Sequence, residues 1–133
     1  MEINLPDVKA EVDALHDRYE AALMANDTDT LQALFWNSPN TIRYGIGETL
    51  YGWEEIGAFR SARSPVGLAR TTSRTRITTY GRDYATASTL FERASLPGKI
   101  GRQMQTWARM PEGWRIVAAH VSVIDVRPPG VLA

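Results

Sequence analysis

Four long β-type segments separated by tight turns fill the second half of the chain, and they constrain its fold more than any other feature. These segments cover residues 68–80, 84–95, 100–110 and 114–126. Turn residues such as Gly81-Arg82-Asp83 and Pro97-Gly98 lie between them, so consecutive segments are expected to pair as antiparallel strands. The second half of the chain therefore predicts a sheet built as a meander.

The first half of the chain has helical periodicity instead. Apolar residues recur at steps of three and four over residues 6–26, with Pro6 in the first turn. A second, short helix follows and ends before Asn37, and a short strand is expected over residues 41–44. Glycines then mark a loop that leads into a third helix, expected over residues 53–63.

Helices followed by an antiparallel meander are typical of an α+β domain in which the helices pack on one face of a curved sheet. Such a sheet, with four long strands and a short one, can leave an open cone in which a ligand binds. A single domain is expected to span residues 1–133, with an ordered core over about residues 6–126, because 44% apolar residues suffice to fill one core.

The charges of the chain balance, with fifteen acidic and fifteen basic residues. This balance gives no reason to expect a nucleic acid or an anionic membrane as the partner, so a small molecule is expected. The basic residues are thirteen arginines and two lysines. Because arginine forms paired hydrogen bonds with planar carboxylates, this bias indicates buried ion pairs or an anionic ligand.

Several classes of chemistry are excluded by what the sequence lacks. The absence of cysteine excludes disulfides and thiolate nucleophiles, and it makes the cytoplasm the expected compartment. No apolar run approaches the roughly 20 residues of a membrane span, and the acidic amino terminus is unlike a signal peptide. The two histidines, His16 and His120, have no metal-ligand spacing, and neither a Gly-x-Ser-x-Gly elbow nor a phosphate-binding glycine loop is present.

Arg43 and Tyr19 are the first candidates for a functional site. Strand alternation puts Arg43 on the opposite face from Ile42 and Tyr44, so its guanidinium faces either a cavity or solvent. A buried position would require an anion, because an unpaired buried charge is costly. Tyr19 lies on the inward stripe of the first helix, where it is either a structural core residue or a phenol that donates to an oxyanion or a leaving nitrogen.

The hairpin over residues 101–122 carries polar groups among tryptophans. Strict alternation places Gln105 on one face with Trp107, and it places Trp114 and His120 together on one face of the partner strand. Such a patch suits either the wall of a cavity or a dimer interface. His120 is accordingly either a hydrogen-bonded structural residue or a pocket group.

The order of these elements, together with the run GWRIVAAHVS near the end, resembles the nuclear-transport-factor-2-like superfamily, also called cystatin-like or SnoaL-like. The resemblance covers nearly the whole chain. The segments TIRYG, GLART and GRQMQTW are similar to the AtzH-like branch of that superfamily, which includes proteins of the HpxZ type from oxalurate catabolism.

The resemblance implies a cone-shaped fold and an enzyme that needs neither a metal nor an organic cofactor. The implied reaction is the decarboxylating amidohydrolase step that removes one N-carboxyl group from a dicarboxylated urea to give allophanate, as in cyanuric acid or oxalurate breakdown. Tyr19 and Arg43 match the tyrosine of the first helix and the arginine of the first strand that are implicated in catalysis in this branch. A homodimer and a functional association with an amidase of the same pathway are expected as well.

The remaining binding residues are expected around these two. Arg70, Gln105 and His120 would position the second carboxylate and the urea core. Arg63 would close the mouth of the cone, and Trp53 is expected to contact the substrate. Two rival functions stay open: an isomerase or dehydratase of the same fold with His120 as its base, and a non-catalytic module for ligand binding or assembly.

Overall fold

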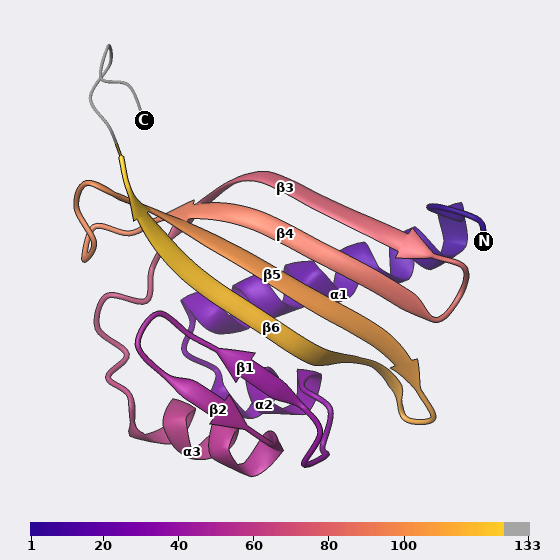
Figure 1. The fold of residues 1–133 in the computed structure, drawn as a ribbon, viewed down its shortest axis with the longest axis horizontal. Coiled ribbons are helices and arrows are strands. Elements are labelled where there is room, and N and C mark those ends of the chain that lie inside the picture. The colour runs from indigo at the N-terminus through magenta and orange to yellow at the C-terminus, as the bar shows by residue number, and fades with distance from the viewer. Residues whose placement is uncertain (127–133) are drawn as a thin grey trace.

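The structure, a computed structural model, describes residues 1–126 and confirms the predicted α+β class. Three helices belong to the first half of the chain and the four long strands to the second (Figure 1). The elements are α1 (Pro6–Met24), α2 (Thr28–Leu34), β1 (Ile42–Tyr44), β2 (Thr49–Tyr51), α3 (Trp53–Ala62), β3 (Thr71–Tyr80), β4 (Tyr84–Glu92), β5 (Lys99–Met110) and β6 (Gly113–Asp125).

The six strands form one sheet in the order β2-β1-β6-β5-β4-β3. Neighbouring strands are antiparallel except for β1 and β6, which run parallel. In Figure 1, α1 lies along one face of the long strands, and α2 and α3 lie near β1 and β2. The parallel pairing sets Arg43 of β1 beside Ala119 of β6, so the first half of the chain adds side chains to the inner face of the sheet.

The predicted elements are present, mostly with shorter ends. Helix α1 ends at Met24, β3 begins at Thr71 and β4 ends at Glu92, each two or three residues short of the expected limit. Strand β2 has no counterpart among the expected elements. It has three residues of which two are exposed, which is too short and too polar for a periodic signal.

Helix α1 packs its predicted apolar stripe against the sheet. Its buried side chains form one core cluster with side chains of the long strands. Each large apolar side chain buried in this way stabilises the fold by roughly 1.5–3 kcal/mol, so the inner face of α1 is firmly fixed. The cluster includes Val8, Val12, Tyr19, Leu23, Trp107, Trp114 and Ile116.

A β-bulge in β6 changes which side chains face the helices. Trp107 of β5 pairs with Ile116, whereas the preceding Thr106 pairs with Ala118, so Val117 is an extra residue in β6. An inserted residue of this kind turns every later side chain to the opposite face of the sheet.

The expectation that Trp114 and His120 share one face is therefore wrong. Trp114 and Ile116 are buried toward the helices, and after the bulge Ala119 takes the buried side. His120 is exposed on the outer face of the sheet.

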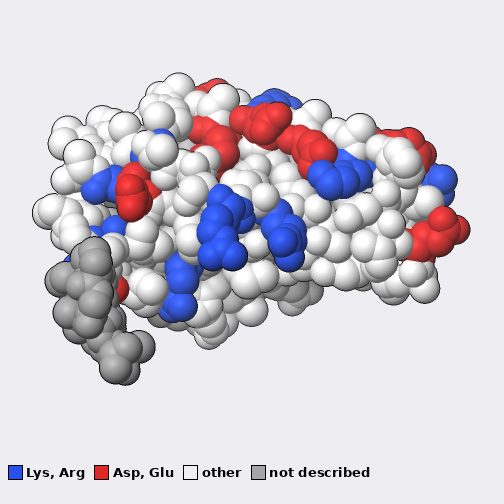
Figure 2. All heavy atoms as spheres, turned by 90° about the horizontal axis from the view of Figure 1, so that it is seen from above, with Lys and Arg blue, Asp and Glu red and all other residues white. Residues whose placement is uncertain are grey.

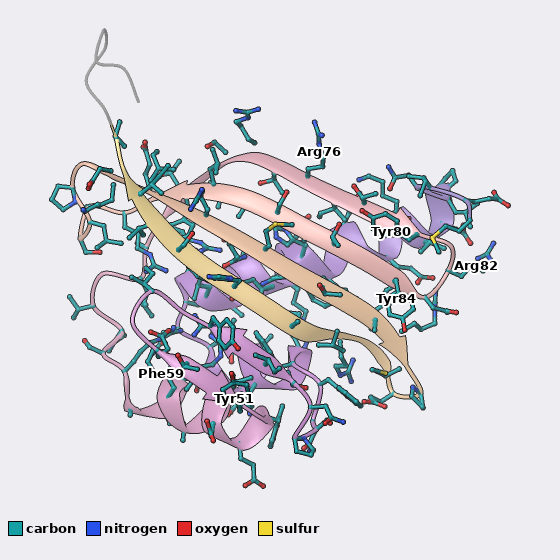
Figure 3. All side chains as sticks on the ribbon, viewed as in Figure 1. Tyr51, Phe59, Arg76, Tyr80, Arg82 and Tyr84 are labelled. Atoms are coloured by element: carbon teal, nitrogen blue, oxygen red, sulfur yellow. The ribbon has the colours of Figure 1, made fainter. Side chains whose placement is uncertain are left out.

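The exposed surface carries charges of both signs. Figure 2 shows basic and acidic side chains side by side on the face seen from above. Arg74 and Arg76 of β3 are exposed, and Figure 3 shows Arg76 extending away from the sheet. Within residues 1–126, none of the helices is long and apolar enough to cross a membrane.

Candidate functional site

A cavity of about 150 Å³ lies between the end of α1, the β1–β2 hairpin, the end of α3 and the inner face of β5 and β6. Three larger hollows, of about 310, 280 and 320 Å³, lie elsewhere on the surface. Arg60 lines the hollow of about 280 Å³, and none of the three gathers more than one buried charged side chain. Arginines make up most of the polar wall of the smaller cavity. Its lining residues are Leu23, Arg43, Ile46, Glu48, Phe59, Arg63, Leu68, Arg70, Arg93, Gln103 and Val121.

Arg43 faces this cavity and not solvent. It is 7% exposed, while its strand neighbour Tyr44 is exposed on the other face. Nη1 of Arg43 donates a hydrogen bond of 2.7 Å to Oε1 of Glu48, and the guanidinium lies 5.6 Å from the centroid of the Phe59 ring. The anion that a buried arginine requires is therefore supplied, in this structure, by the protein's own Glu48.

Arg70 enters the cavity from the loop before β3 and is held on three sides. Its Nε and Nη2 donate to the two carboxylate oxygens of Glu20 on α1. Its Nη1 and Nη2 donate to Oε1 of Gln103 on β5, each at 3.2 Å. The guanidinium also lies 4.6 Å from the centroid of the Phe91 ring. Arg70 thus connects α1 to β5 while it presents its charge to the cavity.

Arg60 is buried beside the cavity and forms no ion pair with any carboxylate of residues 1–126. It lies one turn after the buried Ile56 on the inner face of α3, is 2% exposed, and stacks 4.9 Å from the centroid of the Phe35 ring. None of its three side-chain nitrogens has an acceptor in good hydrogen-bond geometry within residues 1–126, and the Tyr19 hydroxyl is a polar group that interacts with it. Burial lowers the pKa of Arg60 below its ordinary value, because the charged form is poorly solvated there. A bound anion would stabilise that charged form.

Arg63 and Arg93 complete the basic wall. Both are half-buried, and Nε and Nη2 of Arg63 and Nε of Arg93 have no partner among residues 1–126. Burial and the nearby positive charges of Arg60 and Arg43 lower the pKa of Arg63 to about 10. Burial and the charge of Arg70 likewise lower the pKa of Arg93.

The charges around the cavity do not balance. Within residues 1–126, the carboxylates that form ion pairs with these arginines are those of Glu20 and Glu48. The positive charges outnumber them in a partly water-excluded setting, where electrostatic attraction to a small anion is strong. We call the five residues the arginine cluster: Arg43, Arg60, Arg63, Arg70 and Arg93.

Tyr19 is 3% exposed on the inner face of α1, within electrostatic reach of the cluster. Burial alone would raise the pKa of its phenol. The charges of Arg60, Arg43 and Arg70 outweigh that effect, so the pKa of Tyr19 falls below its ordinary value of 10.0. A phenol in this environment gives up its proton more readily than a free tyrosine, and the phenolate that remains is stabilised by the guanidinium groups.

Four of the residues predicted at the site therefore come together. Arg43, Arg63 and Arg70 line the cavity, and Tyr19 lies against the arginines. The chain positions them from four separate elements, namely α1, β1, the end of α3 and the loop before β3.

Gln105 lies near the site but does not line the cavity. It is 2% exposed on the inner face of β5, and its Oε1 accepts a hydrogen bond of 3.1 Å from Nε1 of Trp107. Its Nε2 has no partner within residues 1–126. The residue of β5 that reaches the cavity is Gln103, one pleat away on the same face.

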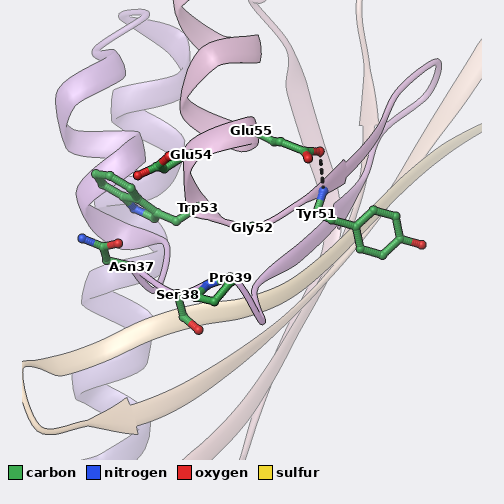
Figure 4. Close-up of a pocket in the computed structure, with 8 residues that line it drawn as sticks. All are labelled: Asn37, Ser38, Pro39, Tyr51, Gly52, Trp53, Glu54 and Glu55. Atoms are coloured by element: carbon green, nitrogen blue, oxygen red, sulfur yellow. Dashed lines mark hydrogen bonds between the residues drawn. The ribbon is translucent and has the colours of Figure 1, made fainter.

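His120 and Trp53 lie elsewhere. The bulge in β6 puts His120 on the outer face, where its ring centroid is 5.8 Å from that of Tyr44. Trp53 begins α3, and its Nε1 donates to the carbonyl oxygen of Gln32 at 2.9 Å, which ties α3 to α2. Figure 4 shows Trp53 in a separate surface pocket next to Glu54. Neither residue lines the cavity, although Trp53 lines a different surface hollow together with Arg60.

Sequence reasoning did not assign Arg60, Arg93 or Glu48 to the site. The sequence does hold a signal for Arg60, because a charged residue four positions after Ile56 lies on the apolar face of the helix. Arg93 and Glu48 lie in or next to turns, where charged side chains are normally solvated, so no pattern distinguishes them. Among residues 1–126, no three or more His, Cys, Asp and Glu side chains are grouped so that they could hold a metal ion.

Comparison with known proteins places the chain among similar folds. A family model described as AtzH-like matches residues 1–127. The crystal structure of a protein of unknown function from the DUF3225 family of Pectobacterium atrosepticum is 58% identical, with a TM-score of 0.89, and the alignment covers 92% of this chain and 95% of that chain.

Two further solved structures show the same architecture. A cystatin-like fold protein from Burkholderia xenovorans is 51% identical over 96% of this chain and 99% of that chain, with a TM-score of 0.90. A nuclear transport factor 2 superfamily protein from Salmonella enterica serovar Typhimurium is 28% identical over 94% of this chain and 95% of that chain, with a TM-score of 0.67. No curated protein matches the chain.

Proposed function

This chain belongs to the AtzH-like family, and from that premise we propose that it is an enzyme of nitrogen-compound catabolism. The proposed reaction removes one N-carboxyl group from a dicarboxylated urea and yields allophanate. Both the family and the nuclear-transport-factor-2-like fold agree with the resemblance seen in the sequence. Family membership supports an amidohydrolase-type role, and the particular substrate is our proposal.

The observation that carries the proposal is the unpaired, buried guanidinium of Arg60 next to Tyr19 and the rest of the arginine cluster. A dicarboxylated urea has a carboxylate at each end, so it brings two negative charges to a cavity with an excess of positive charge. Arginine binds planar carboxylates through paired, charge-assisted hydrogen bonds. The ligand class that best completes this site is therefore a small dianion.

The chemistry needs no activated nucleophile. An N-carboxylate is a carbamate, which loses carbon dioxide when its nitrogen gains a proton. The bond between nitrogen and the departing carboxyl carbon breaks, and its electron pair stays on nitrogen, where the proton is added. One dianion and one proton thus give one allophanate monoanion and one carbon dioxide.

Tyr19 and four arginines of the cluster each have a role in that step. Tyr19 supplies the proton to the nitrogen or a hydrogen bond to the urea oxygen, and Arg60 stabilises the phenolate that is left. Arg43 orients one carboxylate and offsets charge on the urea carbonyl, while Arg63 and Arg70 hold the other carboxylate. The proton returns to Tyr19 from solvent after the products leave.

The test is the rate of allophanate formation from enzymatically generated dicarboxylated urea, measured against the uncatalysed rate. We expect wild type to exceed that background, Tyr19→Phe to be about 10²–10⁴-fold slower than wild type, and Arg43→Ala about 10²–10³-fold slower. Tyr84→Phe, at an exposed tyrosine on β4, is the matched control and should retain the wild-type rate. A wild-type rate equal to background would refute the catalytic proposal.

The two rival functions give different results in the same assay. A non-catalytic binding module would bind the dianion without raising the rate. An isomerase or dehydratase with His120 as base would form no allophanate above background, and its activity on carbonyl substrates would survive Arg43→Ala. The exposure of His120 on the outer face gives that reaction no support.

A further inference from the structure

The β1–β2 hairpin carries a carboxylate into the cavity. Glu48 precedes β2, lines the cavity and has a side chain that is 21% exposed. Its Oε1 accepts the 2.7 Å hydrogen bond from Nη1 of Arg43, and its Oε2 accepts one of 3.1 Å from the main-chain nitrogen of Gly47. The turn itself is closed by a hydrogen bond of 2.9 Å from the nitrogen of Gly45 to the carbonyl oxygen of Glu48.

Gly45 provides the space in which this carboxylate lies. A Cβ atom at Gly45 would be 1.7 Å from Oε1 of Glu48, which is an impossible contact. A Cβ atom at Gly47, in the same turn, would meet nothing within 4 Å. Neither glycine has a positive φ, so alanine fits the main chain at both positions. The missing side chain at Gly45, and not at Gly47, is therefore what allows Glu48 to reach Arg43.

Glu20, the other carboxylate that pairs with the cluster, is placed differently. It binds Arg70 through both oxygens from within helix α1, and it does not line the cavity. Glu48 instead lies on a short turn at the cavity wall. Its carboxylate is hydrogen-bonded to Arg43, the arginine that matches the catalytic position of the family. Its carboxylate occupies one edge of that guanidinium in the way a bound carboxylate would.

We propose that Glu48 is a specificity-determining residue, whose carboxylate holds the position on Arg43 that the ligand's carboxylate takes over on binding. This inference rests on the proposed function only in choosing Arg43 as a carboxylate-binding residue. The exchange replaces one charge-assisted hydrogen bond to Arg43 with another of the same kind, so it takes little from the binding free energy of an anionic ligand. A neutral urea of the same shape offers Arg43 only an uncharged acceptor, so it displaces the Glu48 carboxylate less well and the cavity selects against it.

Calorimetric titration with malonate, a dianion that cannot lose an N-carboxyl group, tests the exchange without turnover. Glu48→Gln keeps the shape and the acceptor oxygen but removes the competing charge, so malonate should bind at least about fivefold more tightly than to wild type. Glu112→Gln, at the tip of the β5–β6 hairpin, is the control for loss of one negative charge and should bind like wild type. Equal or weaker binding to Glu48→Gln would overturn the proposal.

A glycine pair tests the same exchange with every charge kept. Gly45→Ala pushes the Glu48 carboxylate off Arg43 and should strengthen malonate binding several-fold, whereas Gly47→Ala should leave it unchanged. Identical affinities for these two variants, or no malonate binding by any of the proteins, would refute the exchange. A wild type that binds malonate as expected but forms no allophanate would instead refute the proposed reaction and leave the exchange standing.

Discussion

At the scale of single residues, the guanidinium of Arg60 is a buried positive charge with no negative charge bound to it in the described part of the chain. It is 2% exposed, and within residues 1–126 it forms no ion pair, while the hydroxyl of Tyr19 interacts with it. Stacking on Phe35 returns part of the cost of its burial through a cation–π contact. A buried guanidinium beside Tyr19 and Arg43 lowers the stability of the fold through its desolvation. Such a charge is typical of a functional site and not of a structural core.

Arg60→Met should therefore separate stability from activity. Because methionine fills a similar volume without a buried charge, the free energy of unfolding should stay the same or rise by up to about 1–4 kcal/mol. Allophanate formation should fall at least about 100-fold, because the Tyr19 phenolate loses the cation that affects its pKa most. Urea denaturation and the rate assay measure the two effects, and Arg76→Met, at an exposed arginine of β3, should change neither. A destabilised variant with full activity would contradict this role for Arg60.

His16 makes the stability of the protein depend on pH. It is 4% exposed, and burial lowers its pKa below the ordinary 6.5 although the carboxylate of Glu20 acts in the opposite direction. As the pH falls below about 6.5 the unfolded chain binds a proton that the folded protein resists, so the free energy of unfolding decreases in that window. Above it, His16 is neutral in both states and contributes no pH dependence.

Urea denaturation above and below that pH checks the sign of this effect. His16→Leu should lose part of the decrease that wild type shows on acidification, and His120→Leu, at the exposed histidine, should retain it. A decrease of the same size in wild type and in His16→Leu would show that other groups cause it.

At the scale of elements, the pairing of β4 with β5 sets the position of two cations. Phe91 lies opposite Gly101 in the register, and a Cβ atom at Gly101 would be 2.1 Å from the Phe91 ring. Arg70 and Arg93 both stack on that ring, at 4.6 and 4.9 Å from its centroid. Gly101 thus permits the ring position on which two arginines of the cluster, Arg70 and Arg93, depend.

Gly101→Ala should accordingly be costly. The added methyl group forces the Phe91 ring from its position, which is expected to lower the free energy of unfolding by about 1–3 kcal/mol. Malonate binding should weaken as well, because Arg70 and Arg93 move with the ring. Thermal or urea denaturation and calorimetry measure these effects, with Gly47→Ala as the control in open space. Unchanged stability would mean that the ring can relax without loss.

Periodicity predicts the elements well because each long helix or strand buries one continuous face. The sequence predicts α1, α3 and the four long strands for this reason, but β2 is too short to show a pattern. In the sequence, the bulge in β6 is visible only as a change in which alternate positions are apolar. Trp114 and Ile116 are buried before it, and Ala119 and Val121 are buried after it. Strict alternation overlooks that shift, and the error puts His120 on the wrong face.

The candidate site is less predictable, because its burial depends on contacts between distant segments. Local alternation limits Arg43 to a cavity or solvent, and the family resemblance favours the cavity. Arg60 becomes a buried cation only when α3 packs over Phe35, and Arg93 joins the wall only through the ring of Phe91. No local pattern contains those contacts.

At the scale of the whole molecule, the outer face of the sheet lies opposite the site. Tyr44, Met104 and His120 are exposed there around a shallow hollow of about 320 Å³. The homodimer expected from the resemblance stays a proposal, and this face is where we place its contact. Exposed apolar side chains grouped on a sheet face favour such an association.

Light scattering tests the assembly. Wild type should have the mass of a dimer, and Met104→Glu, which introduces like charges opposite each other, should shift it to a monomer. Lys9→Glu, on the far helix α1, changes the charge by more and should leave the dimer intact. A monomeric wild type would contradict the dimer and leave the cavity and its chemistry untouched.

The most direct test of the site is a crystal structure determined with malonate at saturating concentration. We expect one malonate in the cavity, with a carboxylate in hydrogen-bond contact with Arg43 and Arg60, close to the Tyr19 hydroxyl, and with Glu48 moved off Arg43. Malonate bound on the outer face beside His120, or a cavity that stays free of it, would contradict the claim that the arginine cluster is the functional site.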